Sequence, residues 1–221
     1  MRLWPIITAL LLILAGCGFA RQASQPPELH TGLVVLTTYR GSCTAVNLRN
    51  LGLQMIAATA RHCIIPGQTV DVQSLGGLDY GVAVVIAVHG DSALIQYTPA
   101  HKLDFYETTS APPPGSDVWL IGSSRMTAPD TRPLAFTPLF SYGKYIGRWY
   151  DPEEPSLAAF YISAQPGFSG SPIFYNGKVF AITVSIVTPF PHSPWTYGVL
   201  LDELLKRPVM LRRPVSSLLG A

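Results

Sequence analysis

A serine between two glycines is the residue of this sequence best suited to act as a nucleophile. Residues 165–172 read QPGFSGSP and put Ser169 on a turn that leads into an apolar run. Glycines let the backbone turn tightly, so that the hydroxyl is exposed and successive N–H groups point into one concavity. This arrangement suits acyl transfer, although ordinary Gly-Ser turns have the same composition.

A histidine and an aspartate earlier in the chain could activate this serine. His62 directly follows a predicted strand, and Asp91 stands at the start of another. Taken singly, His62 would be read as a turn histidine and Asp91 as a solvated turn residue or cap. A serine hydroxyl needs an adjacent base, and that base needs a third group to orient it. The three residues together therefore predict a catalytic triad.

Short apolar runs bounded by turn residues continue through the whole chain and predict strands. The predicted strands cover residues 33–39, 44–48, 54–59, 69–73, 81–89, 93–97, 117–121, 135–140, 158–163, 172–175, 178–187 and 196–200. Only residues 201–206 look helical. Three consecutive prolines at 112–114 fix an extended connector between the two halves. The pattern indicates an all-β protein with a barrel or sandwich in each half.

Three motifs in the order His, Asp, Ser resemble those of chymotrypsin-fold (trypsin-like) serine proteases, and most of all the Htr family of exported bacterial proteases. TARHC at 59–63 is similar to the TAxHC box, DSALI at 91–95 to DxALI, and PGFSG at 166–170 to PGNSG, with NGK at 176–178 after it. The resemblance covers about residues 30–205. It implies two antiparallel six-stranded β-barrels with a short C-terminal helix. The chain departs from the Htr family in one respect, because no sequence follows residue 221 that could hold a PDZ domain, and none is expected.

The resemblance also implies an activity, that of a serine endopeptidase working through an acyl-enzyme. His62, Asp91 and Ser169 would be its catalytic residues, and the N–H groups of Gly167 and Ser169 would form its oxyanion hole. Phe168 departs from the family, which has a polar residue before the nucleophile. Activation by a buried salt bridge at that position is therefore not expected.

Four residues are expected to bind substrate. Ser163 would lie near the base of the first specificity pocket, with Val184, Ser185 and Ile186 along a wall. Because neither Asp nor Lys occupies that base, a small or apolar substrate side chain is expected. Ser171 replaces the second glycine of the family motif, a change tolerated in some relatives.

Two alternatives to a peptidase remain open at this point. The first is a non-catalytic peptide- or protein-binding module on the same fold, because fold does not fix function. Retention of all three triad residues argues against it. The second is an esterase using the same triad, which is chemically possible but lacks an α/β pattern.

The charge composition indicates which classes of partner the chain can bind. Charged residues make up 13% of the 221 residues and the net charge is +2. Nucleic-acid binding is not expected because the chain has no electrostatic footprint for phosphates. The sequence predicts a protein or peptide substrate, no cofactor and no metal.

The N-terminus predicts export. Residues 3–16 are almost wholly apolar behind Arg2, and the run is too short to span a bilayer. Residues 1–16 therefore read as a signal peptide. Leu14 to Cys17 resembles the lipobox of bacterial lipoproteins, in which the cysteine carries lipid. We expect a membrane-anchored lipoprotein facing the periplasm or cell exterior, the alternative being cleavage after Ala20 and secretion.

The three cysteines fit this reading. With Cys17 assigned to lipid, Cys43 and Cys63 remain as an even pair, which favours a disulfide in an oxidising compartment. The Htr resemblance also puts a partner cysteine at position 43. A metal site is discounted because the nearest other ligand, His62, is adjacent to Cys63.

The expected organisation follows from these features. It comprises a signal peptide (1–16), a linker (17–29), an N-terminal barrel (30–108), a proline-rich inter-barrel linker (109–116), a C-terminal barrel with helix (117–206) and a tail (207–221).

Overall fold

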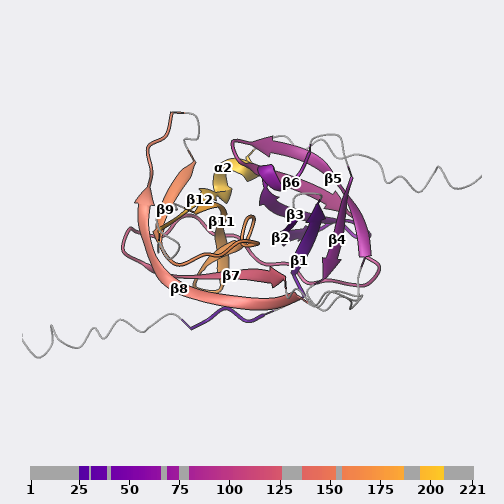
Figure 1. Cartoon of the computed structure of the whole chain (residues 1–221), viewed down its shortest axis with the longest axis horizontal. Coiled ribbons are helices and arrows are strands. Elements are labelled where there is room, and N and C mark those ends of the chain that lie inside the picture. Colours follow the sequence, from indigo (N-terminus) through magenta and orange to yellow (C-terminus); the bar gives the residue numbers. More distant parts are fainter. Residues whose placement is uncertain are drawn as a thin grey trace, which may run out of the picture.

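Two closed, six-stranded antiparallel β-barrels lie side by side in the protein (Figure 1). The computed structural model describes residues 25–29, 31–38, 41–65, 69–74, 80–125, 136–152, 156–186 and 195–206. The N-terminal barrel comprises β1 (Leu33–Thr38), β2 (Gly41–Asn50), β3 (Met55–Ala60), β4 (Val70–Ser74), β5 (Tyr80–His89) and β6 (Ser92–Tyr97). The C-terminal barrel comprises β7 (Asp117–Arg125), β8 (Phe136–Arg148), β9 (Leu157–Tyr161), β10 (Pro172–Tyr175), β11 (Lys178–Ile186) and β12 (Trp195–Leu200).

Both barrels have the same strand order. In the N-terminal barrel the order is β1-β2-β3-β6-β5-β4, and β4 pairs with β1 to close it. In the C-terminal barrel the order is β10-β11-β12-β9-β8-β7, and β7 pairs with β10. Closure leaves no strand edge exposed along the barrel wall. The predicted fold, two six-stranded antiparallel barrels with a short helix, is confirmed.

The hydrophobic core runs from one barrel into the other. One buried cluster joins N-terminal residues such as Leu94 and Ile95 to Ile121, Phe174 and Ile182 of the C-terminal barrel. A second cluster, which contains Phe160 and Phe180, fills the interior of the C-terminal barrel. Because interiors are close-packed, a core that crosses the junction fixes the two barrels against each other.

The C-terminal helix α2 (Leu201–Leu205) follows β12 and returns to the N-terminal barrel, where it contacts β5 and β6 (Figure 1). Its Leu201 and Leu204 side chains are fully buried. The end of the chain's second half is therefore anchored on the first barrel.

The prediction for β8 is wrong in length. A strand was expected over residues 135–140, whereas β8 covers Phe136–Arg148. Gly143 looks like a strand breaker in the sequence, but it is needed inside the strand. A Cβ at Gly143 would lie 2.1 Å from the carbonyl oxygen of Tyr161 on β9. Only glycine lets β9 approach β8 at this point.

Several expectations concern residues outside the described ranges. The signal peptide, the lipobox at Cys17 and the tail at 207–221 are among them. Within the described ranges, no helix is both long enough and apolar enough to cross a membrane.

Candidate active site

The ends of two neighbouring strands bring His62 and Asp91 together. β3 and β6 pair so that Ala60 stands opposite Ser92. His62 lies in the 3-10 turn η1 (Arg61–Cys63) just after β3, and Asp91 lies in the turn just before β6. The adjacent register leaves the imidazole and the carboxylate at the same edge of the N-terminal barrel.

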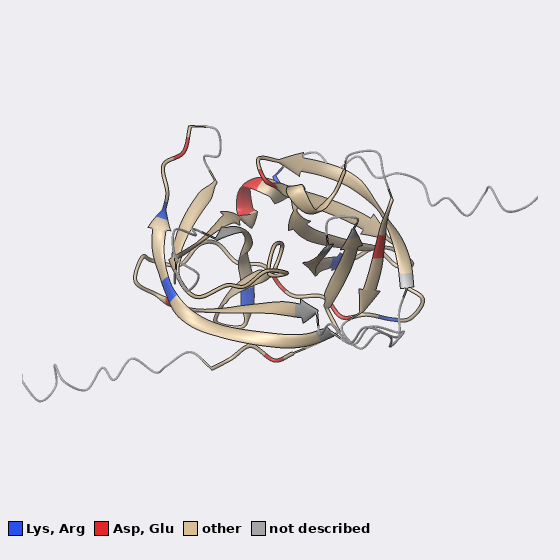
Figure 2. Ribbon diagram, viewed as in Figure 1, with Lys and Arg blue, Asp and Glu red and all other residues tan. Residues whose placement is uncertain are grey.

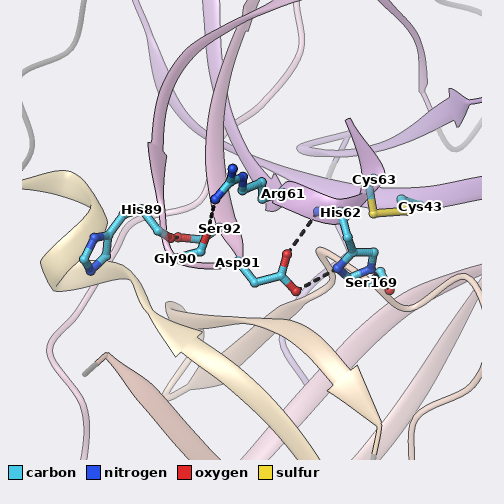
Figure 3. A network of polar contacts seen from close by, with 9 residues as sticks. All are labelled: Cys43, Arg61, His62, Cys63, His89, Gly90, Asp91, Ser92 and Ser169. Atoms are coloured by element: carbon cyan, nitrogen blue, oxygen red, sulfur yellow. Dashed lines mark hydrogen bonds and ion pairs between the residues drawn. A yellow bond between two sulfur atoms is a disulfide. The ribbon is translucent and has the colours of Figure 1, made fainter. Parts of the chain in front are cut away.

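Backbone contacts orient this pair. The Arg61 N–H donates to the Asp91 carbonyl at 2.9 Å, and the His62 N–H donates to Asp91 Oδ1 at 3.0 Å. The other carboxylate oxygen, Oδ2, lies 2.8 Å from His62 Nδ1 (Figure 3). The Ser92 hydroxyl holds the turn by donating to the His89 carbonyl at 2.6 Å. The carboxylate therefore has a fixed direction toward the ring.

The serine comes from the other barrel. Ser169 lies in the loop between β9 and β10, and its Oγ is 2.8 Å from His62 Nε2 (Figure 3). The side chains of His62 and Asp91 are 41% and 40% exposed, so the cluster lies open to solvent at the junction of the barrels. The three residues predicted as a triad are brought into hydrogen-bonding distance of one another.

A disulfide secures the histidine side of the site. Cys43 on β2 is bonded to Cys63, with an S–S distance of 2.08 Å. Cys63 is the residue after His62, and both cysteines are buried. The predicted disulfide is present, and it ties η1 to the neighbouring strand.

The loop before Ser169 is a tight turn. The Phe168 N–H donates to the Gln165 carbonyl at 3.0 Å, and Gly167 has a φ of 96°. Pro166 and Gly167 thus occupy the positions at which type II turns favour Pro and Gly. No acceptor in the described part of the chain takes up the N–H of Gly167 or of Ser169. Their role as oxyanion-hole donors stays a prediction.

Phe168 anchors this loop in the C-terminal barrel. Its ring is fully buried and belongs to the cluster that fills the barrel interior. It lies directly over Gly122 of β7, where a Cβ would come within 2.4 Å of the ring. Apolar packing therefore holds the residue before the serine, at the position where the family has a polar side chain.

Thr44 of β2 connects the loop to the N-terminal barrel, and sequence reasoning missed it. Its N–H donates to the Ser169 carbonyl at 2.9 Å. Its hydroxyl lies 3.1 Å from the Gly167 carbonyl, to which it donates, and accepts from the Ser123 N–H at 3.1 Å. A Cβ at Gly170 would lie 2.1 Å from the Thr44 carbonyl. No motif marks Thr44, since it reads as an ordinary strand residue.

The residues expected to bind substrate differ in their exposure to solvent. Ser163 is exposed, whereas the Val184 side chain is 5% exposed and packs in the core. Ser185 and Ile186 pair through their backbones with Tyr197 and Thr196 of β12, and their side chains are outside what the structure describes. Any contact of Val184 with substrate would therefore be made by its backbone.

Two closed six-stranded antiparallel barrels with a short C-terminal helix are the chymotrypsin-like fold. The chain has this fold. No protein-family model matches the sequence, and no curated protein is similar to it in sequence.

Several solved structures are similar to this chain in fold. The MamO protease domain of Magnetospirillum magneticum is 14% identical with a TM-score of 0.62, and the match covers 79% of this chain and 94% of that one. A human pathogenic astrovirus serine protease is 17% identical with a TM-score of 0.62, over 85% of this chain and 99% of that one. The Rv3671c protease of M. tuberculosis, in an inactive form, is 15% identical with a TM-score of 0.57, over 79% and 86%. At these identities the similarity shows the fold alone.

Proposed function

We propose that the protein is an exported serine endopeptidase that hydrolyses peptide bonds through an acyl-enzyme. The observation that carries the proposal is the pair of 2.8 Å contacts of the His62 ring, Nε2 to Ser169 Oγ and Nδ1 to Asp91 Oδ2. An ionised carboxylate can only accept hydrogen bonds, so a proton on Nδ1 is directed to Asp91. Nε2 is then left as an acceptor for the serine proton.

The reaction follows from this arrangement. As Ser169 Oγ attacks the substrate carbonyl carbon, His62 takes the hydroxyl proton and Asp91 stabilises the resulting imidazolium. When the C–N bond breaks, the imidazolium gives that proton to the leaving amine, and the acyl group stays on Ser169. A water molecule, deprotonated by the same histidine, then attacks the acyl carbonyl carbon. The bond to Ser169 Oγ breaks, the imidazolium returns its proton to that oxygen, and the carboxylic acid leaves.

The oxyanion would be stabilised by the Gly167 and Ser169 N–H groups. Donors of this kind contribute about 3–4 kcal/mol each to the transition state in related sites. The turn at Gly167, whose φ is positive, supports the role, because the hydrogen bond that closes it is donated by the Phe168 N–H and does not use the N–H of Gly167. A substrate strand would lie along β11 near Val184, with its small or apolar side chain toward Ser163.

Export and a lipid anchor at Cys17 complete the proposal. They rest on the sequence pattern of residues 1–17, and the Cys43–Cys63 disulfide supports them because such bonds persist in oxidising compartments.

The test is covalent labelling of the processed, purified protein with a fluorophosphonate probe. We expect the wild type to be labelled at Ser169 and Ser169→Ala to be unlabelled. His62→Ala should lose nearly all labelling, because an unassisted serine hydroxyl is a poor nucleophile. Asp91→Asn should lose much of it, because the amide permits the wrong imidazole tautomer.

Folding is checked for each variant by its thermal unfolding. The losses should be far from additive, since the three residues serve one transition state. A folded wild type that is never labelled would identify the non-catalytic binding module instead. Undiminished peptidase activity of Ser169→Ala would remove the nucleophile assignment.

A further inference from the structure

Six aromatic side chains share the outer face of the C-terminal barrel. We call this surface the aromatic face, and it consists of Trp119, Tyr142, Trp149, Tyr161, Trp195 and Tyr197. They come from β7, β8, β9, β12 and the residue that follows β8, and Figure 1 shows β8 and β9 on the outer side of that barrel. Tyr142, Trp149, Tyr161 and Trp195 are between 40% and 50% exposed. Large apolar side chains that gather on one exposed face are a feature of interaction sites.

Strand register makes the surface continuous. Trp119 stands opposite Tyr142, and the residue two positions after Tyr142, Lys144, stands opposite Tyr161. Tyr161 in turn stands opposite Trp195. Partners across an antiparallel pair point to the same side of the sheet, so these residues form one row across four strands.

Ring contacts confirm the arrangement. The centroids of Trp119 and Tyr142 are 5.0 Å apart, and those of Tyr161 and Trp195 are 5.6 Å apart. A third pair, Trp149 and Tyr197, has its centroids 5.5 Å apart. Aromatic pairs at these distances hold each other in place. The face is thus preorganised rather than a collection of separate side chains.

The charges on this face are paired. Lys144 contacts the carboxylate of Asp117, and Arg148 lies 3.4 Å from Asp202. Asp117 also accepts a hydrogen bond from the Tyr142 hydroxyl, which raises the pKa of Tyr142 above its ordinary value. Figure 2 shows few charged residues on the C-terminal barrel. A strongly charged partner is therefore not expected on this face.

The N-terminal segment leaves the barrels beside this face. The Glu28 carbonyl accepts a hydrogen bond from the Tyr106 hydroxyl at 3.3 Å, and the Tyr106 ring lies 5.0 Å from the ring of Phe174. Phe174 stands opposite Trp119 in the pairing of β10 with β7. The eleven residues from Cys17 to Pro27 can reach at most about 35–40 Å.

We propose that the aromatic face lies on the surface of a lipid bilayer. Tyrosine and tryptophan are the side chains enriched at membrane interfaces, where a ring meets the acyl boundary and its polar tip stays wet. The proposal uses the lipid anchor at Cys17, which belongs to the proposed function. A lipid on Cys17, at the end of this short segment, would insert into the same bilayer on which the aromatic face lies.

Intrinsic fluorescence tests this directly. Of the four tryptophans, Trp4 lies in the predicted signal peptide and the other three are on the aromatic face. The processed protein is placed in phosphatidylcholine vesicles with brominated acyl chains, and its emission is compared with that in unbrominated vesicles. We expect strong quenching, equal in zwitterionic and anionic vesicles and at low and high salt, because the charges are paired. Unquenched emission overturns the proposal, as does quenching that needs anionic lipid.

Matched variants separate the face from the tether. Tyr142→Ser with Trp149→Ser leaves Trp195 as a reporter and should lose most of the quenching. The control, Leu53→Ser with Phe105→Ser, removes two exposed apolar side chains, 85% and 49% exposed, from outside the C-terminal barrel. It should keep the quenching. Equal loss in both variants overturns the proposal.

Two further measurements distinguish a failure of this proposal from a failure of the proposed activity or of the proposed lipid anchor. Fluorophosphonate labelling is recorded on the same samples, and the mass of the N-terminal peptide shows whether Cys17 carries lipid. A chain without lipid is mixed with excess brominated vesicles and must still be quenched, or the proposal fails. A dimer whose emission shifts to the blue without vesicles would identify a second copy as the occupant and would also overturn it.

Discussion

One buried hydroxyl of the N-terminal barrel, that of Thr44, helps to hold the loop that carries Ser169. Thr44 is fully buried, and its side chain and N–H reach the carbonyls of Gly167 and Ser169 on the other barrel. Its own carbonyl accepts from the Thr59 hydroxyl at 2.8 Å, three residues before His62. Thr44 therefore contacts both the loop that carries Ser169 and the strand that leads to His62.

We predict that Thr44→Val lowers the rate of fluorophosphonate labelling and that Thr44→Ser restores it. Valine keeps the shape but leaves the Gly167 carbonyl and the Ser123 N–H without this partner, at a cost of about 1–3 kcal/mol for each buried group. The substrate KM should change little while kcat falls, because the loop positions the oxyanion donors. Equal kcat in the valine and serine variants would leave Thr44 a purely structural residue.

At this scale the sequence predicts some residues and not others. His62, Asp91 and Ser169 are recognisable because each stands in a short local motif. Thr44 is not, because its role depends on the distances to Ser123 and Gly167, which only the packing of two barrels sets. Phe168 was noted as a departure, but its packing over Gly122 could not be inferred from spacing.

At the scale of elements, the loop between β9 and β10 depends on β7. We predict that Gly122→Ala strongly destabilises the protein, because the new Cβ would meet the Phe168 ring at 2.4 Å. Phe168→Ala should cost about 3–5 kcal/mol of unfolding free energy through the cavity it leaves. In that background Gly122→Ala should cost far less than alone. Additive changes in a denaturant-unfolding cycle would show that the two residues do not act together.

Strands were predictable to different extents. The runs that became β3, β6 and β10 are short, apolar and bounded by turn residues, so their positions follow from the pattern. The strand predicted over residues 135–140 is shorter than β8, and the approach of the Tyr161 carbonyl that requires glycine at position 143 is a tertiary feature. The aromatic face was not foreseen, since its members become neighbours only through the register of four strands.

At the scale of the whole molecule, the Cys43–Cys63 disulfide closes a loop of 20 residues. We predict that the Cys43→Ala, Cys63→Ala double variant loses about 3 kcal/mol of unfolding free energy on the chain-entropy model. Denaturant unfolding of the oxidised wild type and the variant gives the difference, and the reduced wild type should match the variant. Identical midpoints for all three would contradict a stabilising role.

The lipid anchor proposed at Cys17 leads to a second prediction at this scale. Cys17→Ser should leave the precursor unprocessed or release the protein from membranes. In the lipobox hypothesis this cysteine is both the site of lipid attachment and the first residue after cleavage. Fractionation of cells and the mass of the N-terminal peptide measure the outcome. A variant processed and fractionated like the wild type would favour an ordinary signal peptide.

The order of the strands along the chain has a consequence for when activity can begin. β12 is the last strand within the described residues, and it completes the wall of the C-terminal barrel by pairing with β11 and with β9, the strand that leads into the Ser169 loop. A chain still emerging during synthesis or translocation can already display His62, Asp91 and Ser169 while that wall is open. The pairing of β12 with β9 and the docking of α2 on β5 and β6 are added to this site after the residues of the triad have been synthesised. The wall of the C-terminal barrel is therefore complete only after nearly all of the described chain has been synthesised.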